Sequence, residues 1–360
     1  DHLEILNIIS IIGIYSFNLF CISLFISPSI ILLKTTKINI SVFILFFLIT
    51  FSFYVLGSKN LNKFNNTEAE KHNYKIRIIS SNISIDRYYN NTDPVTIIEE
   101  LIKISSPDKN EKIIFVWPEG ILPEISQNQL HEYKWLFENK FDANHLLAIG
   151  INSQIHKGQN IKYFNSLSVY NKNIDLVSSY DKINLVPFGE FLPFEKILNM
   201  VGFKTITNNY QSYSKGQRRN IIQINLGDYS FKILPLICYE IIYSGKIFDN
   251  GDFDFIINIS EDGWFGESIG PQQHFVHSIL RSIESGKYIL RSANNGITAI
   301  INPLGVVEKR VDLNQSGYVD FIESKKIEPT FYSKYGNKIF VLIILLYIFL
   351  IFSFNKIKHE

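Results

Sequence analysis

Apolar residues are concentrated at the two ends of the chain. No side chain is charged from Ile5 to Leu33 or from Ile38 to Ser58, and both runs reach or exceed the roughly 20 residues that cross a bilayer core. The run from Ile339 to Asn355 is close to the lower limit of about 17 residues, and a lysine stands at each of its ends. These patterns predict three transmembrane helices. Buried core helices are the alternative, and it is strongest for the C-terminal run.

Between these ends, short β-branched runs alternate with segments of helical periodicity. The expected strands are Ile76–Ile85, Lys112–Trp117, Leu146–Asn152, Tyr163–Tyr170, Ile174–Tyr180, Phe231–Ile237, Phe253–Ile259, Tyr288–Ser292 and Ile297–Asn302, with a last strand after the Asn302-Pro303-Leu304-Gly305 turn. Helices are expected after Asp93-Pro94, over Gln127–Asn139 and over Gln272–Ser285. This alternation is typical of an α/β layered domain.

The pattern divides the chain into four parts. Residues 1–58 are a membrane domain of two helices, 59–75 a polar linker, 76–325 the α/β domain and 339–355 a C-terminal membrane helix. The polar stretch from Thr205 to Arg219 has no clear period, which is typical of a plain surface loop or of a mobile arm over a site. The chain begins Asp1-His2-Leu3-Glu4 without Met or a basic signal-peptide start, so we expect a fragment with further spans upstream.

Charge and cysteine usage exclude some classes of protein. The 35 Lys and Arg residues nearly balance 34 Asp and Glu, and a net charge of +1 gives no electrostatic footprint for nucleic acid. The two cysteines, Cys21 and Cys238, form no disulfide framework. Lysines in the loop between the first two apolar runs and in the C-terminal tail favour a cytoplasmic position for these two segments. Residues 60–338 would then lie on the other side of the membrane. Lysines at the opposite membrane edge weaken this bias.

Glu119, Lys182 and Cys238 are candidates for a catalytic centre. Each lies at the end of an expected strand or in the turn after it, where α/β folds gather their sites. A thiol with a pKa of about 8.5 is mostly protonated at neutral pH, so a base must take its proton. Glu119 is the candidate base, and Lys182 the cation for the thiolate and for the oxyanion formed at an attacked carbonyl. Taken singly, each has a simpler explanation: Lys182 as an exposed ion pair, Glu119 as a solvated turn residue and Cys238 as a packed small hydrophobe.

The sequence around these residues resembles a known superfamily. The blocks are Trp117-Pro118-Glu119-Gly120, Tyr180-Asp181-Lys182, Val186-Pro187-Phe188-Gly189-Glu190, Ile237-Cys238-Tyr239-Glu240, Ser260-Glu261-Asp262-Gly263-Trp264-Phe265-Gly266, Gly270-Pro271-Gln272-Gln273-His274-Phe275 and Arg291-Ser292-Ala293-Asn294-Asn295-Gly296. In their Glu, Lys, Cys order they resemble the nitrilase, or carbon-nitrogen hydrolase, superfamily. The last three blocks narrow the resemblance to the apolipoprotein N-acyltransferases, membrane enzymes of bacterial lipoprotein maturation.

The resemblance implies a fold and a reaction. The fold is an αββα sandwich inserted between transmembrane helices, on the periplasmic side of the bacterial inner membrane. An acyl chain would pass from a phospholipid, with phosphatidylethanolamine the expected donor, to a cysteine thioester. In a second, ping-pong step it would pass to the α-amino group of an S-diacylglyceryl-cysteine at a lipoprotein N-terminus. No cofactor or metal is implied, and we expect a monomer.

The resemblance also assigns roles by position. Cys238 is then the nucleophile, Glu119 the general base and Lys182 the oxyanion stabiliser. Glu190 matches a second essential carboxylate that orients or charges the lysine. Tyr239 and Glu240 match positions that shape the site, whereas Trp264 lies in a block near the lipid-facing pocket and is equally explained as a core aromatic.

Two departures from the family pattern and two alternative functions remain. Gly120 stands where Thr or Ser is more usual, which is expected to loosen the turn that carries Glu119, and Glu261 replaces an Asn and adds a carboxylate.

His274 and His277 lie three apart on an expected helix, but no third ligand follows at zinc-like spacing. A membrane-tethered carbon-nitrogen hydrolase has the same triad, and a silent lipid- or lipoprotein-binding protein is the alternative from another class.

Overall fold

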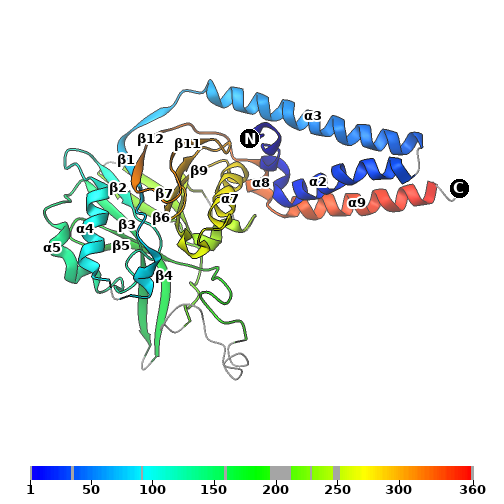
Figure 1. Cartoon of the computed structure of the whole chain (residues 1–360). Coiled ribbons are helices and arrows are strands. Elements are labelled where there is room, and N and C mark those ends of the chain that lie inside the picture. Colours follow the sequence, from blue (N-terminus) through cyan, green and yellow to red (C-terminus); the bar gives the residue numbers. More distant parts are fainter. Residues whose placement is uncertain are drawn as a thin grey trace.

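The computed structural model describes residues 2–33, 36–90, 92–157, 160–194, 212–227, 229–245 and 252–357. An α/β sandwich forms one end of the molecule, and three long helices project together from one side of it (Figure 1). Within the described ranges the sandwich contains two six-stranded sheets.

The first sheet has the strand order β12-β1-β2-β3-β4-β5. Its strands are β1 (Glu70–Ser80), β2 (Ile113–Val116), β3 (His145–Lys157), β4 (Asn160–Tyr170), β5 (Leu176–Asp181) and β12 (Gly317–Ser324). Strands β1, β2 and β3 are parallel to one another, whereas β12, β4 and β5 join by antiparallel pairing. Strand β5 therefore runs in the same direction as β2.

The second sheet repeats this plan with the order β11-β10-β9-β8-β7-β6. Its strands are β6 (Ile222–Leu226), β7 (Tyr229–Ile237), β8 (Phe255–Glu261), β9 (Tyr288–Asn294), β10 (Thr298–Ile301) and β11 (Val307–Val311). The parallel strands β7, β8 and β9 occupy its centre. All seven residues of β8 are buried, as expected for a central parallel strand covered on both faces.

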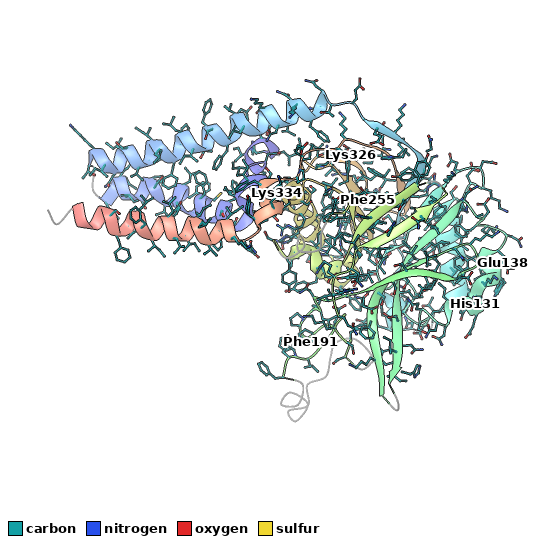
Figure 2. The ribbon with its side chains drawn as sticks, turned by 180° about the vertical axis from the view of Figure 1, so that it is seen from behind. His131, Glu138, Phe191, Phe255, Lys326 and Lys334 are labelled. Atoms are coloured by element: carbon teal, nitrogen blue, oxygen red, sulfur yellow. The ribbon has the colours of Figure 1, made fainter. Side chains whose placement is uncertain are left out.

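Helices cover the outer face of each sheet, which confirms the predicted αββα sandwich. Helix α4 (Pro94–Ser105) packs its Ile98 and Leu101 against the first sheet, and α7 (Gly270–Ser285) packs Phe275 against the second. Asp93 caps α4 by accepting the Val95 N–H, with Pro94 at the first position as the sequence predicts. The main apolar core lies between the sheets, where Figure 2 places Phe255.

The apolar ends of the chain form the projecting helices. These are α2 (Ile9–Leu33), α3 (Lys37–Asn65) and α9 (Lys338–Ile357), with the short α1 (Leu3–Leu6) before them and α8 (Phe331–Tyr335) at their base, near Lys334 in Figure 2. By length and composition α2 and α3 are able to cross a membrane. The apolar part of α9 is shorter, so the third span stays a prediction.

Helix α2 is broken where it meets the sandwich. Gly13 has φ 73° and ψ 165°, which interrupts the helical hydrogen bonds. The Ile14 N–H instead donates to Glu284 Oε1 of α7 at 2.9 Å, and Ile9 packs against Ile283. The buried carboxylate of Glu284 therefore binds the first projecting helix to the α/β domain.

Several element bounds differ from the expectation. The segment 59–75 is not a linker throughout, because α3 continues to Asn65 and β1 begins at Glu70. The helix expected over Gln127–Asn139 is reduced to a 3₁₀ turn η2 (Leu130–Tyr133) and α5 (Lys134–Phe137). The edge strand β6 was not predicted. Its polar and apolar residues alternate over only five positions, too few for a clear signal.

Candidate active site

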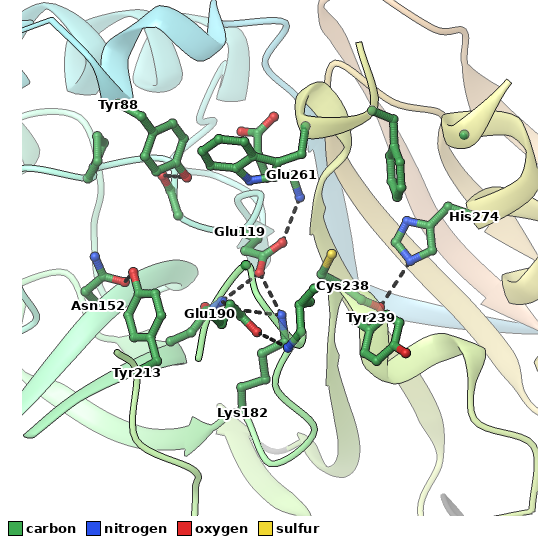
Figure 3. A pocket seen from close by; sticks show the side chains of 18 of the residues that line it. Tyr88, Glu119, Asn152, Lys182, Glu190, Tyr213, Cys238, Tyr239, Glu261 and His274 are labelled. Carbon is green, nitrogen blue, oxygen red and sulfur yellow. Dashed lines mark hydrogen bonds and ion pairs between the residues drawn. The ribbon is translucent and has the colours of Figure 1, made fainter. Parts of the chain in front are cut away.

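The residues predicted to carry chemistry follow strands that end at one edge of the sandwich. Glu119 follows β2 after Trp117-Pro118, Lys182 directly follows β5, and Cys238 directly follows β7. Two of these strands belong to the first sheet and one to the second. Figure 3 shows the three side chains meeting in one pocket, as the sequence predicted.

Lys182 is held between two carboxylates in the interior. Its side chain is 1% exposed, and Nζ lies 3.2 Å from Glu119 Oε1 and 3.0 Å from Glu190 Oε1. Burial by itself disfavours the ammonium, but the charges of Glu119 and Glu190 outweigh it and raise the pKa of Lys182 well above its usual value. The two carboxylates therefore favour the ammonium form of Lys182, and Glu190 provides its second charge partner.

Glu119 is fixed by three hydrogen bonds. Its Oε1 accepts from Asn165 Nδ2 at 2.7 Å as well as from Lys182, and its Oε2 accepts the backbone N–H of Glu261 at 2.9 Å. Asn165 Nδ2 is also 2.8 Å from Glu190 Oε1, so one amide orients both carboxylates. The sequence placed Asn165 within the expected strand Tyr163–Tyr170 and did not mark it as a site residue. A polar amide at a buried strand position was the available signal.

Cys238 lies at a sharp turn between β7 and the 3₁₀ turn η3 (Cys238–Ile242), with a backbone φ of 47°. Its side chain is partly exposed to the pocket. Burial raises the pKa of the thiol above its usual value and the negative charge of Glu119 adds to this, while Lys182 opposes the increase. The resting cysteine is therefore a neutral thiol, which needs a base at the moment of attack.

Glu240 connects the backbones on which Lys182 and Cys238 lie. Its Oε1 accepts the N–H groups of Ile183 at 3.0 Å and Asn184 at 3.1 Å, and its Oε2 accepts the Ile237 N–H at 2.9 Å. This fully buried carboxylate thus binds the residue before the nucleophile and the two residues after the lysine. The structure brings Glu240 to the site without placing it in the cavity, and Glu190 lies in the cavity wall.

A cavity of about 620 Å³ opens above the triad. Aromatic side chains line much of it, among them Tyr88, Tyr239 and Trp264. Trp264 is 43% exposed, with its ring centroid 4.8 Å from that of Tyr88, so it is part of the pocket wall and not a core residue. An apolar cavity with a few convergent polar groups suits a substrate that is largely hydrocarbon.

The two departures from the family pattern are accommodated locally. Gly120 has φ 54°, and its carbonyl accepts a hydrogen bond from the Tyr88 hydroxyl at 2.6 Å, which holds the turn that carries Glu119. Glu261 is buried and forms an ion pair with Arg87. Burial raises the pKa of Glu261 to about 7, and Arg87 opposes this increase. The added carboxylate is therefore balanced by a charge that sequence reasoning had missed.

A second buried polar cluster lies behind the nucleophile. Asp262 Oδ1 is 2.9 Å from His274 Nδ1, and Asp262 Oδ2 accepts from Arg291 Nη2 at 2.7 Å. Burial alone would raise the pKa of Asp262, but Arg291 and His274 outweigh it and lower the pKa to about 2. The Nδ1 atom of His274 is thus held by a contact with another side chain of the protein. Among the described residues, no three His, Cys, Asp or Glu side chains gather as metal ligands would.

Part of the Thr205–Arg219 stretch borders the site. Residues 205–211 lie outside the described residues. The Tyr213 N–H donates to the Glu190 carbonyl at 2.8 Å, and the Gly216 N–H donates to the Lys182 carbonyl at 2.9 Å. The described end of this stretch is therefore hydrogen-bonded to the backbone of Glu190 and of Lys182, and Tyr213 lines the cavity.

Comparison with known proteins gives one family and a consistent set of relatives. Residues 95–320, more than half of the chain, match the family model described as carbon-nitrogen hydrolase. A protein named apolipoprotein N-acyltransferase from Rickettsia bellii (strain RML369-C) is 39% identical over 59% of this chain and 42% of its own length. Those of Wigglesworthia glossinidia brevipalpis and Rhodopseudomonas palustris (strain ATCC BAA-98 / CGA009) are 36% and 27% identical, over 83% and 91% of this chain.

The chain spans about half the length of these curated relatives, with 42% to 63% of each covered. Among solved structures, a mutant of the Nesterenkonia AN1 amidase from the nitrilase superfamily is 12% identical over 73% of this chain and 94% of that chain, with a TM-score of 0.45. On the match to the family model, the chain belongs to the carbon-nitrogen hydrolase family.

Proposed function

We propose that this chain carries the catalytic centre of an apolipoprotein N-acyltransferase. The observation that supports it most is a Glu119–Lys182–Cys238 centre at the base of an aromatic-lined cavity, in a domain bound to two helices able to cross a membrane. An acyl donor that resides in a bilayer requires a catalytic domain kept at the bilayer surface. The names of the relatives at 27% to 39% identity agree with this function.

The first half-reaction would form a thioester on Cys238. Glu119 takes the thiol proton as Sγ attacks the ester carbonyl of a phospholipid, and Lys182 stabilises the oxyanion that forms. The carbon–oxygen ester bond then breaks. Glu119 returns the proton to the departing alcohol oxygen, which leaves as a lysophospholipid.

The second half-reaction would use the same groups in reverse. The α-amino group of an S-diacylglyceryl-cysteine attacks the thioester carbonyl, Lys182 again stabilises the oxyanion, and Glu119 accepts the amine proton. The carbon–sulfur bond breaks, the proton passes to Cys238 Sγ, and an amide bond remains on the lipoprotein. We propose phosphatidylethanolamine as donor, a monomer as the working form, and a site on the periplasmic face of the bacterial inner membrane.

Intact-protein mass spectrometry tests this function. The full chain in detergent, with any missing upstream helices restored, is incubated with phosphatidylethanolamine beside a Cys238→Ser variant. We expect a hydroxylamine-sensitive acyl adduct that requires Cys238 and persists in water until a diacylglyceryl-cysteine peptide is added. Release of free fatty acid without the peptide would instead support a hydrolase, an alternative that is compatible with membership of the carbon-nitrogen hydrolase family. No adduct at all would support a silent binding protein.

A further inference from the structure

We propose that His274 is a positioning residue that holds the Cys238 backbone in its reactive conformation, an inference that rests on Cys238 being the acylated residue. His274 Nε2 lies 3.2 Å from the Cys238 carbonyl oxygen. A carbonyl oxygen only accepts hydrogen bonds, so Nε2 must carry the proton and donate it. Figure 3 shows this bond from α7 to the turn that carries the nucleophile.

The Cys238 backbone needs such support because its conformation is unfavourable. A φ of 47° lies in the left-handed region, which side chains other than glycine seldom adopt and which persists only when the surroundings impose it. Glu240 Oε2 holds the Ile237 N–H on one side of the turn. His274 holds the Cys238 carbonyl on the other side, so hydrogen bonds fix the residue from both directions.

The imidazole is itself fixed in place. Asp262 Oδ1 lies 2.9 Å from Nδ1, and Asp262 in turn accepts from Arg291 Nη2 at 2.7 Å and from the Ser260 hydroxyl at 2.7 Å. His274 is 5% exposed, while Asp262 and Arg291 are fully buried. The chain of contacts from Arg291 through Asp262 to His274 therefore ends on the nucleophile's own carbonyl.

This arrangement predicts which step depends on His274. The residue contacts the backbone of Cys238, so its loss should misplace the thiol relative to Glu119. His274 also lines the cavity, but with only 5% of its surface exposed it contributes little to the wall that holds the acyl chain. Misplacement of a reacting group by about 1 Å can cost around 100-fold in rate. The rate of acylation should fall, while the donor concentration at half-saturation should not change.

The test measures the single-turnover rate of Cys238 acylation against donor concentration in the full chain. We expect His274→Ala to lower the maximal rate by about 10- to 100-fold with unchanged half-saturation. His274→Gln, whose amide N–H reaches the position of Nε2, should recover most of that loss. Gln272→Ala, an exposed position on the same helix, is the matched control and should leave the rate unchanged.

Unchanged acylation in His274→Ala would overturn the inference, as would an equal loss in His274→Gln, since the imidazole would then only fill space. If His274→Ala does not fold, as judged by its unfolding midpoint, Asp262→Asn replaces it, with the same expected fall in maximal rate. Failure of the proposed function is separate, because the wild-type chain would then form no adduct on Cys238.

Discussion

At the residue scale, the charges of the site keep Lys182 paired before and after a proton passes from the thiol to the carboxylate. Lys182 stands between Glu119 and Glu190, so the resting site has two carboxylates and one ammonium. When Glu119 takes the Cys238 proton, the negative charge moves to sulfur and Lys182 keeps Glu190 as its partner. The lysine thus remains paired in both states, and its charge is available to the oxyanion.

Replacement of Glu119 by Gln tests the base. The amide keeps the size of the side chain but accepts no thiol proton, so we expect acylation of Cys238 to fall by about 10²- to 10⁴-fold. The measurement is the single-turnover acylation rate by mass spectrometry. Glu132→Gln, the same substitution at an exposed position, is the control. A Glu119→Gln rate equal to wild type would assign the base to another residue.

Asp262 should make the free energy of unfolding depend on acid. Its folded pKa of about 2 is below the ordinary value of 3.8, so this contribution is complete above about pH 4 and is lost as the pH falls through about 2. The lowered pKa corresponds to a contribution of about 2 kcal/mol to the free energy of unfolding. Denaturant unfolding between pH 5 and pH 2 should show a shallower acid dependence in Asp262→Asn, and equal slopes would contradict the assignment.

The candidate residues could be predicted from sequence only where a local signal existed. Glu119, Lys182 and Cys238 follow strands within recognisable motifs, so their meeting at one edge was expected. Asn165 was visible only as a polar amide in an expected strand, with nothing to indicate its partners, and Arg87 gave no signal. Their roles arise because β4 lies beside β5 and because the turn after β1 meets the end of β8, which no local pattern specifies.

At the element scale, the broken helix α2 depends on its glycine. Gly13 has a backbone conformation that is essentially restricted to glycine, and an added Cβ would lie 2.1 Å from the Tyr332 ring of α8. We expect Gly13→Ala to lower the free energy of unfolding by about 1–3 kcal/mol for strain and about 1–3 kcal/mol more for overpacking.

Gly266 provides a matched control for this substitution. It also has positive φ, 58°, but an added Cβ would meet no atom within 4 Å. Gly266→Ala should therefore show only the contribution of strain. Denaturant unfolding in detergent compares the two variants, and equal losses of stability would mean that Tyr332 does not press on Gly13.

The sequence predicted whether a segment is a strand or a helix where the hydrophobic periodicity was sustained. It did not predict the first and last residues of each element. The alternation of buried strands and helices gave the layers, and the Asp93-Pro94 cap gave the start of α4. The short elements η2 and α5 contain four residues each, which is less than the window over which a helical period is visible. Tertiary packing decided their form.

At the scale of the whole molecule, the exposed faces of the projecting helices distinguish a membrane anchor from a core. Leu48, near the middle of α3, is 58% exposed. Leu48→Arg should oppose insertion by about 2.5–3.5 kcal/mol if α3 spans a bilayer. The measurement is the fraction of the full chain that resists alkaline extraction from membranes, with Leu48→Met as control. Equal retention of both variants would argue against a span at α3.

The position of the projecting helices relative to the sandwich could not be predicted from the sequence. Three apolar runs were visible, but the break at Gly13 and its contact with Glu284 depend on residues far apart in the chain. An uncharged run gives the length of a helix and not the surface against which it packs. The buried Glu284 in α7 was hidden among the polar residues of an otherwise amphipathic helix.

Glu240 has a consequence for how the protein matures. Its carboxylate hydrogen-bonds to backbone groups from both sheets, next to Lys182 and next to Cys238. The two halves of the sandwich must therefore close before the lysine and the cysteine face each other. A newly made chain would carry an ordinary thiol during its synthesis and insertion, and Cys238 would gain its base and its cation only with the final closure of the sandwich.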